Sequence, residues 1–134
     1  MAQWGDFPKD LPAEAGATHI GMFVSWALLS GLSGDIHIVD FPDDIPLLRG
    51  RNITPGAFFL ASCDGKFTTD NLNDEGNAFA ASYFDLEKGQ YLVDYEAALG
   101  KNLPTLYHVS DTWENYDRIA PILDDRLMAW RRRS

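Results

Sequence analysis

Apolar residues dominate one long stretch near the beginning of the chain, from about residue 13 to residue 32, and they face nearly every side of a helical wheel. A helix at a protein surface keeps a polar side, whereas a helix that is apolar all round is packed on several sides. We therefore expect this segment to be the central helix of the fold, with Pro12 in its first turn and an end at Ser33–Gly34. Small residues recur every four positions and predict a stripe that another helix backbone approaches closely: Ala13, Ala17, Gly21 and Ser25.

Turn and capping signals divide the middle of the chain into shorter elements. Prolines and charges between residues 36 and 53 predict an irregular connector, with a short strand at 36–39 and a helical turn around 46–48. Thr54–Pro55 is an N-cap followed by proline, which predicts a helix through Ser62. Asn73 is expected to cap a helix that reaches Phe84, and Gly100 to close a helix over 91–99.

The last helix has the clearest start signal, because Asp111 and Glu114 have the spacing of a capping box. Pro121 lies inside the apolar pattern that follows, so we expect it to kink or split the helix. Asp117 or Arg118 is expected to pair with a neighbouring element, while Trp113 and Tyr116 join the core.

Together these patterns predict a mainly α fold, a compact multi-helix single domain over residues 1–134 around the central apolar helix, with at most one short strand pair. The chain has 134 residues, of which 46% are hydrophobic and 13% aromatic, enough to form a substantial core.

The formal net charge of −9 changes the functional expectation, because a negative field repels nucleic acid and anionic lipid and attracts basic surfaces. Between residues 64 and 99 there are eight acidic residues and two lysines, while Arg131, Arg132 and Arg133 gather at the C-terminal end. We therefore expect no nucleic-acid or membrane partner. The arginines suit the C-terminal end of a helix dipole.

Several other classes of function are disfavoured by the sequence. Cys63 is the single cysteine, so an intramolecular disulfide and a thiolate-rich metal site are excluded. The first residues lack a cationic signal-peptide region, and the apolar run 20–32 is shorter than the roughly 20 residues of a membrane span. No phosphate-binding glycine loop, nucleophile elbow or zinc motif is present. We expect a cytoplasmic, non-enzymatic protein without a cofactor or metal.

Several segments carry a resemblance that covers most of the chain. They are 11–22, Glu75–Ala80, Tyr91–Tyr95, Leu103–Val109 and Asp111–Ile119. In these segments the chain resembles a family of small acidic bacterial proteins of unassigned function. Its size and charge are also similar to those of immunity proteins, which are paired with secreted bacterial toxins. The resemblance implies no catalytic residues.

The first hypothesis is an immunity protein that neutralises a cognate toxin by covering a basic surface with an acidic helical face. The residues predicted to bind the partner are Asp70, Asp74, Glu75, Asp85, Glu87, Asp94 and, as an aromatic anchor, Tyr91. The alternative is a small hydrolase or ligand-binding protein whose pocket is lined by His19, Trp26, His108, Asp111 and Tyr116. A third hypothesis is a homodimer formed through the stripe of small residues on the central helix.

Overall fold

The structure is a computed structural model that describes residues 16–84, 89–101 and 103–133. The described part contains six α-helices and three short 3-10 turns, and its single β-bridge joins Ser33 to Leu72. The mainly helical fold is therefore confirmed. In chain order the elements are α1 (Thr18–Leu29), η3 (Asp35–His37), α2 (Asp44–Arg49), α3 (Pro55–Ser62), η4 (Thr69–Asn71), α4 (Asp74–Tyr83), α5 (Tyr91–Leu99), η5 (Leu106–His108) and α6 (Trp113–Arg133).

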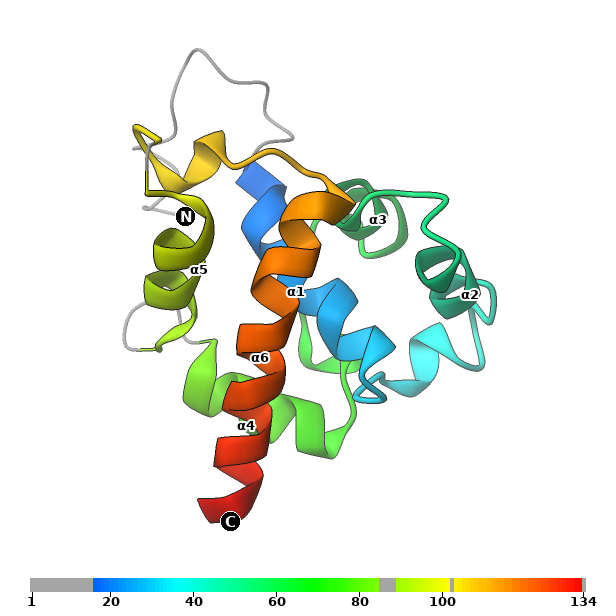
Figure 1. Ribbon diagram of the computed structural model, residues 1–134. Helices are drawn as coiled ribbons and strands as arrows, with labels where there is room; N and C mark the ends of the chain where they lie inside the picture. Colours follow the sequence, from blue (N-terminus) through cyan, green and yellow to red (C-terminus); the bar gives the residue numbers. More distant parts are fainter. Residues whose placement is uncertain (1–15, 85–88, 102, 134) are drawn as a thin grey trace.

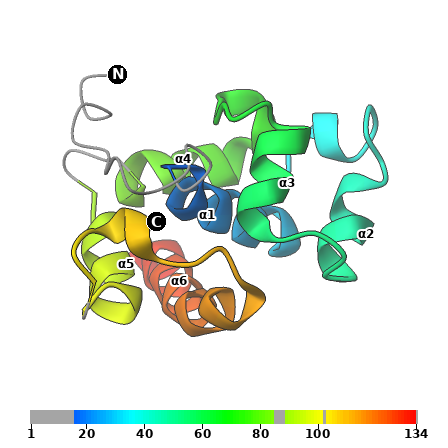
Figure 2. The same cartoon turned by 90° about the horizontal axis from the view of Figure 1, so that it is seen from above.

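The apolar helix α1 lies at the centre, as predicted. Figure 1 shows α6 running across α1, and the view from above shows α1 between α4 and α6 with α3 alongside (Figure 2). Ten of its twelve residues are buried. The helix ends three residues before the predicted Leu32, because Gly31 adopts a positive φ of 85° and closes a Schellman motif. The predicted start near Ala13 lies outside the described residues.

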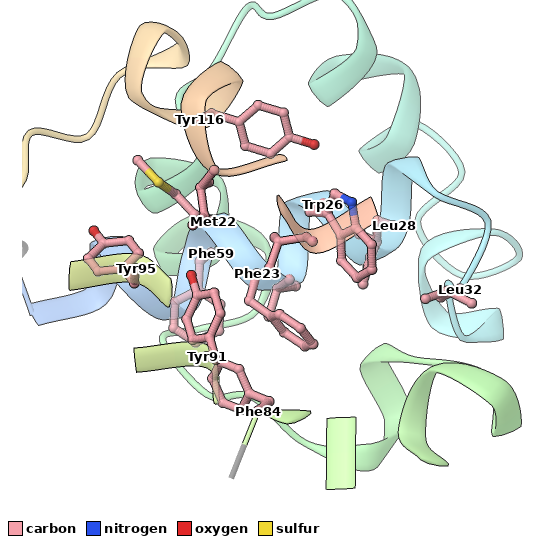
Figure 3. Packing of buried hydrophobic residues seen from close by; sticks show 14 of the residues in the cluster. Met22, Phe23, Trp26, Leu28, Leu32, Phe59, Phe84, Tyr91, Tyr95 and Tyr116 are labelled. Atoms are coloured by element: carbon pink, nitrogen blue, oxygen red, sulfur yellow. The ribbon is translucent and has the colours of Figure 1, made fainter. Parts of the chain in front are cut away.

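Aromatic rings gather around one side of α1 (Figure 3). Phe23 is fully buried, and its ring centroid lies 4.5 Å from that of Phe84 and 5.3 Å from that of Tyr91. Trp26 is also buried, and its indole nitrogen donates a hydrogen bond of 2.8 Å to Asp124 of α6. The core therefore joins α1 to α4, α5 and α6 through side chains that come from distant parts of the sequence.

The other side of α1 meets α3 at very short range. A methyl group at Gly21 would lie 2.7 Å from the carbonyl oxygen of Pro55 and 2.9 Å from Cα of Gly56, closer than real Cβ contacts. The prediction that the small-residue stripe admits a helix backbone is confirmed at this position. Because α3 of the same chain covers Gly21, a homodimer would need a different surface.

Asp111 caps the N-terminus of α3, whereas the sequence predicted that it caps the last helix, α6. Its carboxylate accepts hydrogen bonds from the backbone N–H of Gly56 at 2.8 Å and Ala57 at 3.1 Å, and from the hydroxyl of Thr54 at 2.6 Å. It thereby satisfies N–H groups that the first turn of a helix leaves without partners. Thr112 caps α6, accepting from the backbone N–H of Asn115, so the predicted Asp111–Glu114 capping box is wrong.

Two further predictions need correction, namely the short strand and the splitting of the last helix. Residues 36–39 do not form a strand: η3 ends at His37, and the amides of Ile38 and Val39 bond back to the carbonyl of Asp35. Helix α6 continues through Pro121 without splitting. We attribute this to burial of Ile119 and Leu123 on either side of the proline, which offsets the lost backbone hydrogen bond.

Other local predictions are confirmed. Thr54 and Asn73 cap α3 and α4, and Gly100 closes α5. Asp117 pairs bidentately with Arg51, whose guanidinium also lies over the Trp113 ring at 4.7 Å.

Among the described residues, no helix is both long and apolar enough to cross a membrane.

The position of Asp111 yields a test of how α3 is held. We expect Asp111→Ala to lower the free energy of unfolding by about 2 kcal/mol, because three donors at the start of α3 lose the carboxylate and only Ala57 keeps a second acceptor, the Thr54 hydroxyl. Glu114→Ala is the control, since the capping box predicted from the sequence would make it costly. The exposed Glu114 should contribute less than about 0.5 kcal/mol in urea denaturation. Equal losses in both variants would contradict this assignment.

Candidate functional site

An acidic cleft of about 720 Å³ opens between η3, η4 and the start of α4. Its lining consists of Gly34, Asp35, Ile36, Asp40, Thr69, Asp70, Leu72, Asn73, Asp74 and Asn77. Four of these ten described residues are aspartates and none is basic. The ion pairs found in the described part of the chain involve other carboxylates, so these four charges are not neutralised by a salt bridge.

Two chain segments meet directly beneath the acidic cleft. The backbone N–H of Gly34 donates to the carbonyl of Asn71 at 3.0 Å, and that of Asn73 donates to the carbonyl of Leu32 at 2.8 Å. Gly34 has to be small, because a Cβ at this position would overlap the backbone carbonyl of Asp70. The short distance between η3 and η4 places Asp35 and Asp70 on the same cleft.

A buried polar network fixes η3 against its neighbours. His37 is fully enclosed, with Nδ1 2.7 Å from Asp44 of α2 and Nε2 3.0 Å from the side-chain nitrogen of Asn71. Asn71 Oδ1 accepts from the backbone N–H of Thr68, which orients the amide so that its nitrogen donates to Nε2. The hydrogen of His37 therefore lies on Nδ1 and is donated to Asp44. These hydrogen bonds connect η3, α2 and η4 behind the cleft.

Cys63 belongs to the same network and does not have the properties of a nucleophile. The side-chain nitrogen of Asn71 lies 3.7 Å from its sulfur. Burial, reinforced by the negative charge of Asp44, raises the pKa of the Cys63 thiol to about 12. The group is therefore a protonated thiol at neutral pH, whereas nucleophilic cysteines are thiolates.

Three large apolar side chains stand out from the loop that leaves the cleft. Ile38 is 52% exposed, Val39 69% and Phe41 54%. We call these three residues the apolar ledge. Their loop is held in place by a backbone hydrogen bond from Phe41 to Ile36 at 2.9 Å and from Asp44 to Phe41 at 3.1 Å. Exposed apolar groups on an ordered loop beside polar ones are typical of protein interaction sites.

The structure separates the residues that were predicted to form one acidic face. Asp70 and Asp74 line the acidic cleft. Glu75 is exposed, but Arg131 binds it bidentately at 2.8 and 3.1 Å, and these hydrogen bonds lower the pKa of its carboxyl. Asp85 and Glu87 lie outside the described residues.

Two of the predicted partner-binding residues are in the interior. Tyr91 is fully buried, and its hydroxyl donates to the backbone carbonyl of His19, so the prediction of a surface anchor is wrong. Asp94 is also buried and accepts from Tyr83 at 2.6 Å and from Arg126 at 2.8 and 2.9 Å. Burial raises the pKa of Asp94, but the hydrogen bonds from Arg126 and Tyr83 outweigh burial and lower it overall. A charge count along the sequence cannot distinguish such structural carboxylates from free ones.

The sequence prediction of binding residues did not include Asp35 and Asp40 of the cleft or the apolar ledge in the same loop. A sequence signal did exist, because the ten residues 35–44 contain four aspartates interspersed with apolar side chains. The strand predicted at 36–39 and the acidic region predicted at 64–99 both leave these aspartates out.

Three residues of the alternative hypothesis have hydrogen-bond partners outside the predicted pocket. Trp26 bonds Asp124, Asp111 holds α3, and His108 Nδ1 lies 2.9 Å from the hydroxyl of Thr105. His19 lies instead against two tyrosine rings, with centroids 6.1 Å from Tyr95 and 5.8 Å from Tyr107. No group of three or more potential metal ligands occurs in the described ranges.

His19 gives the structure a specific dependence on pH. Burial lowers the pKa of His19 to about 4, below the ordinary value of 6.5, and its Nδ1 has no hydrogen-bond partner. Since the unfolded chain binds a proton near pH 6.5 and the folded chain does not, stability should decrease as the pH falls below 6.5 and level off below about 4.

We expect His19 to account for a loss of about 2 kcal/mol between pH 7 and pH 5. The measurement compares the free energy of unfolding of the wild type and His19→Phe at both values, with the other two histidines common to both proteins. The wild type should lose about 2 kcal/mol more than the variant on acidification. Parallel pH profiles would show that His19 is not buried in its neutral form.

The family of the chain follows from comparison with known proteins. Neither the curated proteins nor the solved structures contained a match. A family model described as a domain of unknown function (DUF7832) matches residues 3–109, which include the acidic cleft, the apolar ledge and the network around His37. The chain therefore belongs to this family of unknown function.

Proposed function

We propose that this protein is a non-enzymatic binding domain, and specifically an immunity protein of a bacterial cytoplasm that neutralises a cognate toxin. The observation that carries the proposal is the acidic cleft beside the apolar ledge. Four aspartates that form no salt bridge among the described residues line the cleft, and three exposed apolar side chains lie in the loop that carries Asp35 and Asp40. The partner surface would be basic, with apolar groups at the place where it meets the ledge.

The charge arrangement supports a basic protein as the partner. Each aspartate of the cleft repels the others, and a lysine or arginine from a partner would relieve that repulsion. The net charge of −9 adds a field that accelerates the approach of a basic surface. Such complementarity chiefly determines the association rate and the choice of partner.

The apolar ledge would contribute apolar burial, which stabilises the bound complex in a way that charge attraction alone does not. Ile38, Val39 and Phe41 are exposed although the loop that carries them is internally hydrogen-bonded and anchored by buried His37. A loop that is already ordered loses little conformational entropy on binding. Burying a large apolar side chain at an interface contributes about 1.5–3 kcal/mol, so these residues would slow dissociation.

The role of an immunity protein fits a surface that occludes without reacting. The thiol of Cys63, which belongs to the network behind the cleft, has a raised pKa and is buried. The proposed action is steric and electrostatic: the acidic cleft covers a basic or substrate-binding surface of the toxin. The cytoplasmic location is part of the proposal, since a cell needs the immunity protein where its own toxin is made.

The test is capture of a partner from a lysate of the cells that make the protein, at about 50 and 500 mM salt. Three baits are compared: the wild type, a cleft variant and a charge-matched control. The cleft variant carries Asp35→Asn, Asp40→Asn, Asp70→Asn and Asp74→Asn. The control carries four changes at exposed acids elsewhere, namely Asp64→Asn, Glu96→Gln, Glu114→Gln and Asp125→Asn.

The wild type and the control should retain one basic protein at low salt and release it at high salt, while the cleft variant should retain at least about tenfold less. Adding the wild-type chain should also inhibit the toxicity of the captured protein. Equal retention by the cleft variant, or failure of the wild type to retain any basic protein, would contradict binding through the cleft. A retained protein without toxicity would contradict the immunity role only.

A further inference from the structure

A second concave site lies away from the acidic cleft, between α4, the start of α5 and the C-terminal half of α6. Its volume is about 310 Å³, within the range of pockets that hold small ligands. Arg126, Trp130 and Arg133 line it from α6. Their spacing of four and three residues places them on one face of the helix. The chain as a whole has a net charge of −9, but this pocket is lined by two arginines and an indole, so the local charge has the opposite sign.

Arg126 is held in a fixed orientation at this pocket. Nε and Nη2 donate to buried Asp94 at 2.8 and 2.9 Å, and Asp94 is itself fixed by Tyr83 at 2.6 Å. These bonds use two of the five N–H groups of a guanidinium, and the side chain of Arg126 remains 45% exposed. A guanidinium held on one edge by a buried carboxylate loses little freedom when its other edge binds an anion.

Arg133 supplies the net charge, because Asp94 neutralises Arg126. The neighbouring Arg131 is occupied by Glu75, to which it donates two hydrogen bonds. Arg133 has no ion pair within the described ranges, and it is exposed where it lines the pocket. The described groups around the pocket therefore carry a single excess positive charge.

Aromatic rings form the apolar part of the same pocket. Phe79 and Tyr83 of α4 are stacked with centroids 5.2 Å apart and an interplanar angle of 15°. The Trp130 ring meets the Phe79 ring edge-on at 5.6 Å. Phe79 and Tyr83 are buried and support Trp130, which is partly exposed. A planar group can pack against the Trp130 ring while its anionic substituent reaches the arginines. The amide of Gln90 and the hydroxyl of Ser82 add polar contacts at the margin.

We propose that this pocket binds a small aromatic anion, in which a carboxylate or phosphate is attached to a planar ring. The anion is bound by Arg133 and the exposed edge of Arg126, and the ring packs against the partly exposed Trp130. Guanidinium groups match both anions through paired hydrogen bonds. The repulsion from distant aspartates is screened, because the Debye length at physiological salt is about 8 Å.

The experiment is calorimetric titration of the full chain with four probes: phenyl phosphate, benzoate, inorganic phosphate and neutral benzyl alcohol. The two aromatic anions should bind at least about tenfold more tightly than either inorganic phosphate or benzyl alcohol. Absence of binding by both aromatic anions, or equal binding of the neutral alcohol, would overturn the proposal.

Variants locate the binding. Arg133→Gln should weaken the aromatic anions at least about tenfold, since it removes a charge-assisted contact. Arg132→Gln makes the same change in charge at the adjacent exposed residue, which does not line the pocket, and should leave binding within about twofold. Arg126→Lys keeps a cation beside Asp94 but loses the planar fork, and should also weaken binding. If Arg132→Gln and Arg133→Gln weaken binding equally, the attraction is general and the pocket proposal is wrong.

Discussion

The fold depends on the need to surround a helix that has no polar side. Helix α1 presents apolar or small residues in every direction, and it is stable in water only if other elements cover all of them. The helices α3, α4 and α6 cover α1 at different distances from its axis. Gly21 allows the α3 backbone to approach closely, whereas Phe23 and Trp26 pack against Phe79 of α4. Trp26 also donates a hydrogen bond to Asp124 of α6. Asp111 then fixes the start of α3, so the close approach is tied to the chain that leads into α6.

This arrangement leaves the functional candidates to short elements at the periphery. The turns η3 and η4 contribute little to the central core, and the buried contacts of His37 with Asp44 and Asn71 hold them in place. Because these polar groups satisfy one another inside, the neighbouring aspartates and the apolar ledge remain available outside. The opposite occurs at α5, where Asp94 is buried to orient Arg126, and the result is a basic pocket on an acidic protein.

Local features of the fold could be predicted from sequence, whereas the partner residues of long-range contacts could not be identified. Thr54, Asn73 and Gly100 act on their own helix termini, so their residue types suffice to identify them. Asp111 has the spacing of a local cap, yet its three partners lie more than fifty residues away in the chain. Asp94 and Asp70 are equivalent in a count of charges. Only the packing of α5 against α6 buries the first, while the meeting of η3 and η4 leaves the second on a cleft.

The central claim is that the acidic cleft and the apolar ledge form the surface that binds a partner protein. Its most direct test is to measure the association and dissociation rates of the captured partner over a range of salt concentrations. The cleft variant should associate at least about tenfold more slowly at low salt and lose most of its salt dependence. Phe41→Ser, on the ledge, should leave association unchanged and accelerate dissociation about tenfold. If neither variant changes either rate constant, the acidic cleft and the apolar ledge are not the binding surface.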